Sequence, residues 1–225
     1  MPTARERLSH LLQLAGEGPA QRAALVGELA ELVLDWPGDA PQAMRAPVLA
    51  LFDVTAREAD DGMRARLAAR LGGHGDLPLD LVNDFYLCAP KSVRREILMR
   101  NELDLGAFDD GGAAPDAAEL IAAARDVRVR DFAQRLGDSV GIAARTARAV
   151  LADASGEALA VLCRGAHLDR AAFSALALLK IPTDGDPLAQ LAAYDGVPQR
   201  AAGRLTQHWR THQAPHQHLE VAAAE

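Results

Sequence analysis

The chain has 225 residues, enough for one large domain or two small ones with a sizeable hydrophobic core. Its 24 basic and 31 acidic residues give a formal charge of -7, which argues against a general binder of polyanions. Aromatic residues make up only 4% of the chain while alanine and leucine dominate, and this composition favours helices.

We expect neither a targeting segment nor a membrane segment. Arg5, Glu6 and Arg7 interrupt the opening residues, so no signal peptide is recognisable, and no apolar run reaches the ~20 residues that span a bilayer. Cys88 and Cys163 lie on apolar stripes, which favours free buried thiols over a disulfide. These features predict a cytoplasmic protein.

Apolar residues at helical spacing predict a series of helices in the first part of the chain. They cover residues 3–14, 19–35, 44–57 and 62–71, separated mostly by segments with glycine and proline. The helix over 44–57 has a wide apolar arc, which indicates a central position. This arc consists of Val48, Leu49, Leu51, Phe52 and Val54.

Residues 77–101 predict two amphipathic helices that are separated at Ala89 and Pro90, because the residue before a proline avoids the helical region. The arginines of the second helix leave from the side opposite its apolar face. Neither helix can bury its apolar stripe alone, so the pair requires neighbours. The stripes consist of Leu81, Val82, Phe85 and Cys88, and of Val93, Ile97 and Leu98.

A short pattern recurs along this half of the chain. Residues 40–49 align with 89–98, and residues 59–67 form a weaker copy: an apolar residue is followed by arginine, and another apolar residue comes four positions after the first. Unequal spacing makes the repeat irregular. The pattern predicts stacked helical hairpins and resembles the second helix of HEAT-type repeats.

Two stretches carry a resemblance to a known family: LPLDLVNDFYLCAPKSVRREILMRN (77–101) and GEALAVLCRGAHLDRAAFSALALL (156–179). Together they resemble a bacterial family of HEAT-like helical proteins whose domain has no known function, and the resemblance extends over about residues 32–179. It implies an all-α fold, an irregular HEAT-like stack of antiparallel helical hairpins (an α-solenoid or superhelix) with no sheet. The resemblance implies no catalytic residue.

Residues 104–116, DLGAFDDGGAAPD, form the longest stretch without helical periodicity. Long loops in compact domains are functional or disordered, and we interpret this one as a solvated, mobile linker. The acidic residues Asp104, Asp109 and Asp110 lack the alternating oxygens and the closing glutamate of a calcium loop. The stretch predicts a boundary between subdomains 1–103 and 117–213, the latter followed by a flexible tail over 214–225.

Two further helices are predicted over 117–136 and 139–154. Their arginines could form a positive ridge if the helices are neighbours, or a solvated face with intrahelical pairs such as Asp131 with Arg135. The ridge would consist of Arg125, Arg128, Arg145 and Arg148.

Residues 156–180 have the spacing of a helix-turn-helix, with Asp169 as N-cap of the second helix. His167 occupies the turn position that glycine usually holds. A nucleic-acid reader would use the side chains Arg170, Ser174 and Lys180, but the second helix otherwise presents mostly alanine and leucine. Another hairpin of the stack is the simpler interpretation.

The last helix pair is predicted over 188–194 and 198–212, with His208 and His212 one turn apart. Zinc would need a third ligand and a supporting shell of hydrogen bonds, and no HExxH motif is present, so we expect no metal site. The chain also lacks GxSxG, a phosphate-binding glycine loop and a dinucleotide fingerprint, so we expect neither an enzyme nor a cofactor.

These observations predict a protein-interaction scaffold or regulatory adaptor that presents a helical surface to a protein or peptide partner. Because the predicted contacts are arginines, the partner is expected to be acidic; a homodimer is also conceivable. These contacts are Arg94, Arg95, Arg125 and Arg128. The alternatives are a nucleic-acid-binding transcriptional regulator that uses 156–180, and a small-molecule sensor for which no residue set stands out.

Overall fold

A computed structural model describes residues 19–38, 40–75, 77–108, 114–126, 131–181 and 186–212. These ranges contain twelve α-helices, two short 3-10 helices and no strand, which confirms the all-α class. The predicted helix over 3–14, the tail 214–225 and Arg128 lie outside the described residues. No helix within these ranges has the length and apolar character needed to cross a membrane.

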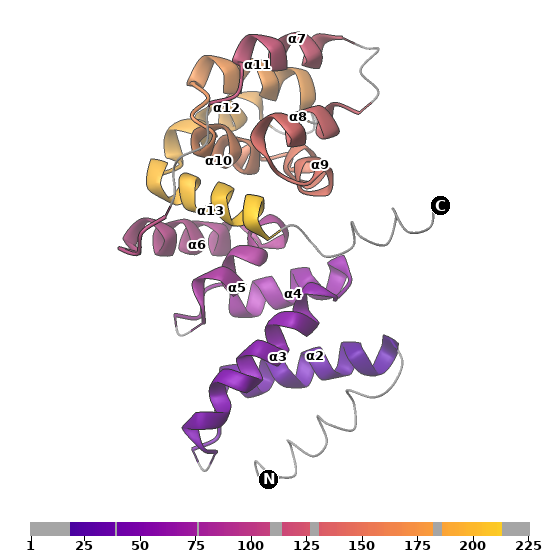
Figure 1. The fold of residues 1–225 in the computed structure, drawn as a ribbon, viewed down its shortest axis with the longest axis vertical. Helices are drawn as coiled ribbons and strands as arrows, with labels where there is room; N and C mark the ends of the chain where they lie inside the picture. The colour runs from indigo at the N-terminus through magenta and orange to yellow at the C-terminus, as the bar shows by residue number, and fades with distance from the viewer. Residues whose placement is uncertain are drawn as a thin grey trace. The chain divides into compact units, whose positions relative to one another are not determined.

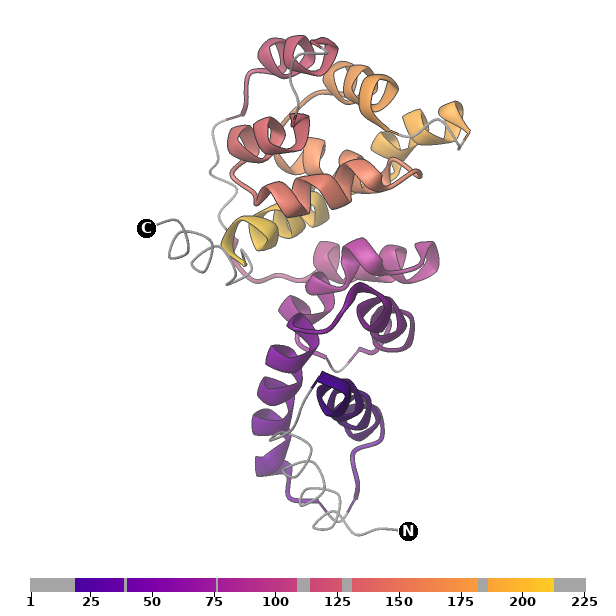
Figure 2. The same cartoon turned by 90° about the vertical axis from the view of Figure 1, so that its right-hand side faces the viewer.

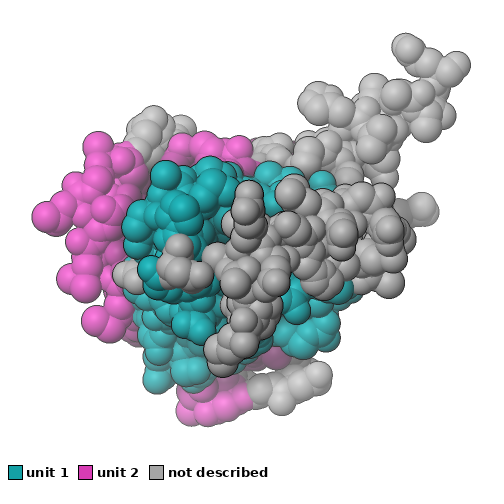
Figure 3. Space-filling view, turned by 90° about the horizontal axis from the view of Figure 1, so that it is seen from below, with its two compact units in different colours: residues 1–97 teal, residues 98–225 magenta. Residues whose placement is uncertain are grey.

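The chain divides into two compact units, Met1–Ile97 (unit 1) and Leu98–Glu225 (unit 2), which Figure 3 colours separately. The division falls inside helix α6 (Lys91–Leu103), whereas the sequence pattern placed the boundary after residue 103. Each unit has its own buried apolar residues.

Unit 1 is built around an antiparallel pair of helices, α2 and α3, with α4 packed against α2 (Figures 1 and 2). Side chains from every α-helix of the unit are buried, including Leu29, Phe52, Leu71, Val82 and Ile97. Its elements are α2 (Pro19–Leu34), η1 (Gln42–Met44), α3 (Arg45–Arg57), α4 (Asp61–Leu71), α5 (Leu79–Asp84), η2 (Tyr86–Cys88) and the start of α6.

The predicted hairpin over 77–101 is confirmed. The chain leaves the helical region at Ala89 (φ -77°, ψ 147°), and α6 begins after Pro90. Val93, Ile97 and Leu98 are buried, as their spacing predicted. A side chain at Gly72 would collide with Val93, so the end of α4 and the start of α6 require a glycine where they meet.

The wide apolar arc predicted for the helix over 44–57 is only partly buried. Val48 and Phe52 are buried, but Leu51 and Val54 are 38% and 55% exposed. The apolar arc is therefore wider than the face that the described residues of unit 1 cover, and α3 keeps an apolar stripe on its outer side.

Unit 2 is centred on α10, whose side chains are buried around its whole circumference. A helix that is apolar on every side belongs in a core, and α10 packs against α9, α11, α12 and α13, while α7 packs against α8 and α11. The HEAT-like stack of successive hairpins stays a prediction. The helices are α7 (Ala117–Arg125), α8 (Phe132–Val140), α9 (Ala144–Ala152), α10 (Glu157–Gly165), α11 (Arg170–Lys180), α12 (Pro187–Gly196) and α13 (Gln199–Thr211).

The predicted boundaries of the helices over 117–136 and 139–154 were wrong. The chain leaves α7 at Asp126 (ψ 108°), and α8 begins after Asp131, whose carboxylate accepts a hydrogen bond from Gln134 N at 3.1 Å. Gly141 then ends α8 in the left-handed region (φ 82°). Aspartate at an N-cap and glycine at a C-terminus outweighed an apolar periodicity that continued through them.

The hairpin over 156–180 is confirmed, including the capping of α11 by Asp169, which accepts from Ala172 N at 2.8 Å. His167 lies in the left-handed region (φ 58°), the conformation that glycine usually supplies after a helix. Leu168 N donates to the Cys163 carbonyl at 2.8 Å, which closes the turn. The turn therefore keeps its geometry with histidine in the glycine position.

Helices α10 and α13 approach closely at Gly165. A Cβ at this position would lie 2.5 Å from the Ala202 carbonyl oxygen and 2.7 Å from Thr206 Cβ. Small residues on both helices thus hold α13 against the core helix, and α13 carries the surface described next.

Candidate partner-binding surfaces

Two arginines one turn apart on α13 bind a segment of the chain that lies far away in sequence. Arg200 donates to the Asp104 carbonyl from Nε (3.1 Å) and Nη2 (2.7 Å), and Arg204 Nη2 donates to the same oxygen (3.1 Å). Both guanidinium groups also donate to the Gly106 carbonyl. Arg204 Nη1 forms an ion pair with the Asp104 carboxylate at 2.8 Å.

The same segment makes two further contacts with α13. The Phe108 ring lies under both guanidinium groups, with its centroid 5.8 Å from Arg200 Cζ and 4.9 Å from Arg204 Cζ. Glu102 Oε2 accepts from Ala201 N at 3.1 Å, in the first turn of α13, where the preceding Pro198 gives no side-chain cap. We call residues 102–108 the strap.

The strap is held by polar and cation–π contacts, while its leucines face solvent: Leu103 and Leu105 are 70% and 89% exposed. In contrast, the Arg204 side chain is only 10% exposed. The interpretation of 104–116 as a solvated linker therefore does not hold for 104–108, and the five residues 109–113 lie outside the described part.

A second surface is the outer side of α3, where Met44, Pro47, Leu51 and Val54 are exposed. Their spacing of three, four and three residues places them in one stripe. The stripe adjoins the face of α3 that carries the buried residues Val48, Phe52 and Ala56. We call it the α3 stripe.

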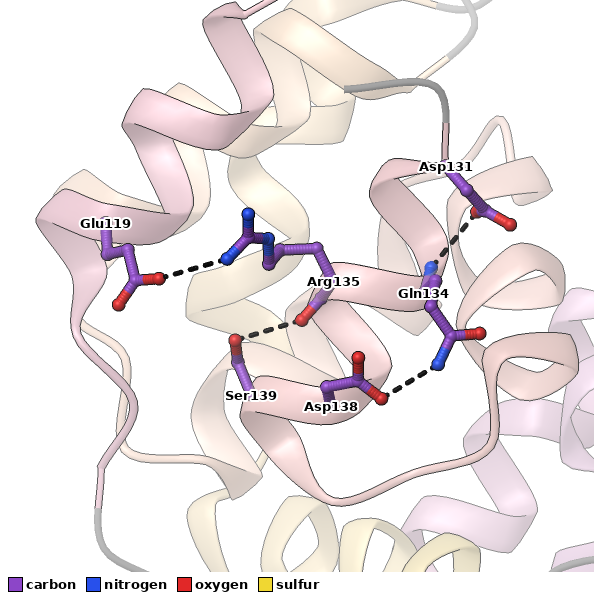
Figure 4. Close-up of a pocket in the computed structure, with 6 residues that line it drawn as sticks. All are labelled: Glu119, Asp131, Gln134, Arg135, Asp138 and Ser139. Atoms are coloured by element: carbon purple, nitrogen blue, oxygen red, sulfur yellow. Dashed lines mark hydrogen bonds and ion pairs between the residues drawn. The ribbon is translucent and has the colours of Figure 1, made fainter. Parts of the chain in front are cut away.

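A hollow of ≈430 Å³ lies between α7 and α8 and is lined by Glu119, Asp131, Gln134, Arg135, Asp138 and Ser139 (Figure 4). Arg135 pairs with Glu119 at 3.4 Å, and Gln134 Nε2 donates to Asp138 at 2.8 Å. Ser139 Oγ donates to the Arg135 carbonyl at 2.9 Å. These exposed side chains satisfy one another, so nothing in the hollow points to a ligand.

Asp131 and Arg135, which were predicted to pair with each other, each pair with a different residue. Asp131 pairs with Arg148 at 2.6 Å, across from α8 to α9, while Arg135 reaches Glu119 on α7. The hydrogen bond from Arg148, together with that from Gln134 N, lowers the pKa of Asp131. Arg148 is thus paired although exposed; Arg125 and Arg145 of the predicted ridge are also exposed, and Arg128 lies outside the described residues.

The arginines predicted to contact a partner differ in their surroundings. Arg94 donates to the carbonyls of Leu87 and Ala89, each at 3.0 Å, and its guanidinium lies over the Tyr86 ring, so it holds its own hairpin together. Arg95, in unit 1, and Arg125, in unit 2, are exposed.

The residues proposed for nucleic-acid reading are all engaged within unit 2. Arg170 Nε contacts both carboxylate oxygens of Asp195, at 3.0 and 3.1 Å. Ser174 Oγ donates to the Arg170 carbonyl, and the Lys180 ammonium lies 5.0 Å from the Phe132 ring centroid. The exposed side of α11 presents Ala171 and Leu178, whose side chains have no hydrogen-bonding groups with which to recognise base edges.

His208 and His212 stack on each other with ring centroids 4.2 Å apart. His208 is buried, and His212 Nδ1 lies 3.2 Å from the His208 carbonyl oxygen. In the ranges that the structure covers, no three potential metal ligands come together.

Both thiols are shielded. Complete burial raises the pKa of Cys163 far above its ordinary range, and partial burial raises the pKa of Cys88. A thiol with a raised pKa is a poor nucleophile at neutral pH.

Sequence reasoning missed the arginine pair of α13, because Arg200 and Arg204 look like part of a solvated helix face. Their partners lie almost a hundred residues earlier in the chain. The only local signal was the coincidence of an acidic stretch with an aromatic residue in the predicted loop.

No curated protein and no solved structure matches the chain significantly. Residues 109–207, which make up most of unit 2, match a family model described as an uncharacterised protein conserved in bacteria (DUF2336). This match gives no support to HEAT-like repeats.

Proposed function

We propose that the protein is a non-enzymatic scaffold or regulatory adaptor that presents helical surfaces to a protein partner. The observation that carries this proposal is the α3 stripe, a row of apolar side chains that the described part of unit 1 leaves exposed. Contiguous exposed apolar residues mark interaction sites in soluble proteins.

The stripe has the geometry that an amphipathic partner helix would match. Alternating spacings of three and four residues form the seam of paired helices, in which side chains of one helix fill the gaps of the other. Covering Leu51 and Val54, which are 38% and 55% exposed, would contribute roughly 1 kcal/mol each before the cost of association.

The exposed arginines Arg95 and Arg125 remain proposed contacts for an acidic partner. Arg94 is a weaker candidate, since it already donates to carbonyls of its own hairpin. A cytoplasmic location belongs to the same proposal and is supported by the two free, shielded cysteines.

The test compares two variants in an affinity capture from native cell lysate. Leu51→Asp combined with Val54→Asp places charge in the α3 stripe, while Ala46→Asp adds one charge to an exposed position of the same helix outside the stripe. We expect quantitative mass spectrometry to show loss of specific proteins with the double variant and retention with the control.

Two outcomes would contradict the proposal. An unchanged set of captured proteins would show that the stripe binds none of them. A large fall in melting temperature in the double variant would show that the stripe belongs to the chain's own packing. Capture that disappears after nuclease treatment would instead favour the nucleic-acid alternative for 156–180.

A further inference from the structure

We propose that the arginine pair of α13 is a receptor site for an acidic peptide segment of a partner protein, and that the strap is a built-in competitor for this site. The inference shares with the proposed function only the assumption that the partner is a protein. It concerns unit 2, whereas the α3 stripe lies in unit 1.

The contacts of the strap define what the site recognises. Arg204 pairs with a carboxylate at position 104, and both arginines donate hydrogen bonds to the main-chain carbonyls at 104 and 106. The two guanidinium groups also cover an aromatic ring at 108. A fitting segment therefore carries an acidic residue, an aromatic residue four positions later, and a bend between them like the one at Gly106, whose N–H donates to the Asp104 carboxylate at 2.9 Å.

The position between these two anchors favours a small residue. A Cβ on Gly106 would lie 3.3 Å from Asp104 Oδ1, which is tighter than ordinary contact, and would also touch Arg204 Nη2 at 3.6 Å. The recognised pattern is thus acidic, any, small, any, aromatic.

The strap supplies most of the partners of the Arg204 guanidinium, whose side chain is only 10% exposed with the strap in place. Its Nε is buried and has no hydrogen-bond acceptor among the described residues, so the guanidinium depends on the strap for compensation. Removing the strap without a replacement would take away the carboxylate that Arg204 pairs with and the carbonyls that it donates to. Exchange of one acidic segment for another avoids that loss.

The strap itself is suited to exchange. It buries no leucine, since Leu103 and Leu105 are exposed, and Asp104 is 38% exposed. Its first two residues are the last two of α6, and this covalent link gives the strap an effective concentration of about millimolar at the site, as short tethers do. A partner segment must bind the arginine pair tightly enough to displace the strap, so the strap sets a minimum affinity for partners.

The test uses a fluorescein-labelled peptide with the sequence of the strap, ELDLGAF, and measures its binding to the full chain by fluorescence anisotropy. Phe108→Ala weakens the strap and leaves the arginines in place. We expect this variant to bind the peptide about tenfold more tightly than the unchanged chain does. Adding Arg200→Ala to Phe108→Ala should abolish the gain.

Matched controls separate the proposed contacts from general effects. Leu105→Ala changes an exposed strap residue, and Arg145→Ala removes an exposed arginine elsewhere in unit 2; neither should change peptide affinity. A peptide with aspartate and phenylalanine replaced by alanine should not bind. If Phe108→Ala reduces the helical circular-dichroism signal, Asp104→Asn removes the ion pair while keeping the side-chain size.

Equal affinity of the unchanged chain and the folded strap variant would overturn the inference, as would a gain that survives Arg200→Ala. The assay needs no natural partner, and the α3 stripe variant should bind the peptide as the unchanged chain does. Failure here with success in the capture experiment would therefore refute the α13 site alone, and the reverse would refute the α3 stripe alone.

Discussion

Replacing Gly165 with alanine should separate the core helix α10 from α13. The added Cβ would lie 2.5 Å from the Ala202 carbonyl oxygen and 2.7 Å from Thr206 Cβ, where ordinary contacts begin at 3.4 Å. Because the nearest obstacles include backbone, the helices must move apart. Overpacking costs about 1–3 kcal/mol, and the gain in helix propensity from glycine to alanine offsets up to about 1 kcal/mol. Because the Ala202 carbonyl oxygen cannot rotate away, we expect a cost at the upper end and a net loss of about 2 kcal/mol.

Gly196→Ala is the matched control. Gly196 is also the last residue of a helix in unit 2, and nothing lies within 4 Å of an added Cβ. We expect its stability to change by no more than about 0.5 kcal/mol. The same substitution thus has different effects at two helix ends, and only the contact with α13 distinguishes them.

The assay is urea unfolding followed by the fluorescence of Trp209, which lies on α13 and is buried. Trp36→Phe in the parent chain leaves Trp209 as the single tryptophan, so the signal reports on unit 2. Thr206→Ala should partly restore the stability lost in Gly165→Ala, because it removes side-chain atoms that the added Cβ would meet. The second substitution should cost little by itself, since the buried Thr206 hydroxyl has no hydrogen-bond partner among the described residues. Equal midpoints for Gly165→Ala and Gly196→Ala would refute the close crossing.

Two further predictions concern the hairpin of α10 and α11. His167→Gly should stabilise unit 2 by roughly 0.5–1 kcal/mol, because glycine adopts the left-handed backbone of this position (φ 58°) without strain; a lower urea midpoint would contradict this. Stability should fall as the pH rises above ~8.5, because burial raises the pKa of Cys163 in the folded chain, while the unfolded thiol ionises at its ordinary pKa. Cys163→Ala should flatten this fall, and an identical pH profile would show that other groups cause it.

The sequence predicted most helices well, because helical periodicity is a local property. The helices over 19–35, 62–71 and 156–180 and the break at Ala89 all follow from apolar spacing, capping residues and proline. The helix over 117–136 was predicted without its interruption, since its apolar spacing continued past Asp126 and Asp131, which end one helix and cap the next.

The candidate contacts were harder to predict than the helices. Arg94 was placed on an outward face by its helical position, yet its long side chain reaches back to the carbonyls of Leu87 and Ala89. Leu51 and Val54 were assigned to a core that does not cover them. The direction of a residue on its helix does not decide what a flexible side chain contacts or how wide the neighbouring surface is.

What the sequence by itself determined is the all-helical class, the hairpin turns and the apolar faces, because each depends on residues within one or two helical turns. Only the tertiary structure decided that Gly165 is the close contact between α10 and α13, and that Arg200 and Arg204 hold the strap. These contacts join residues that are far apart in the chain, and their formation depends on how whole helices pack rather than on any local pattern.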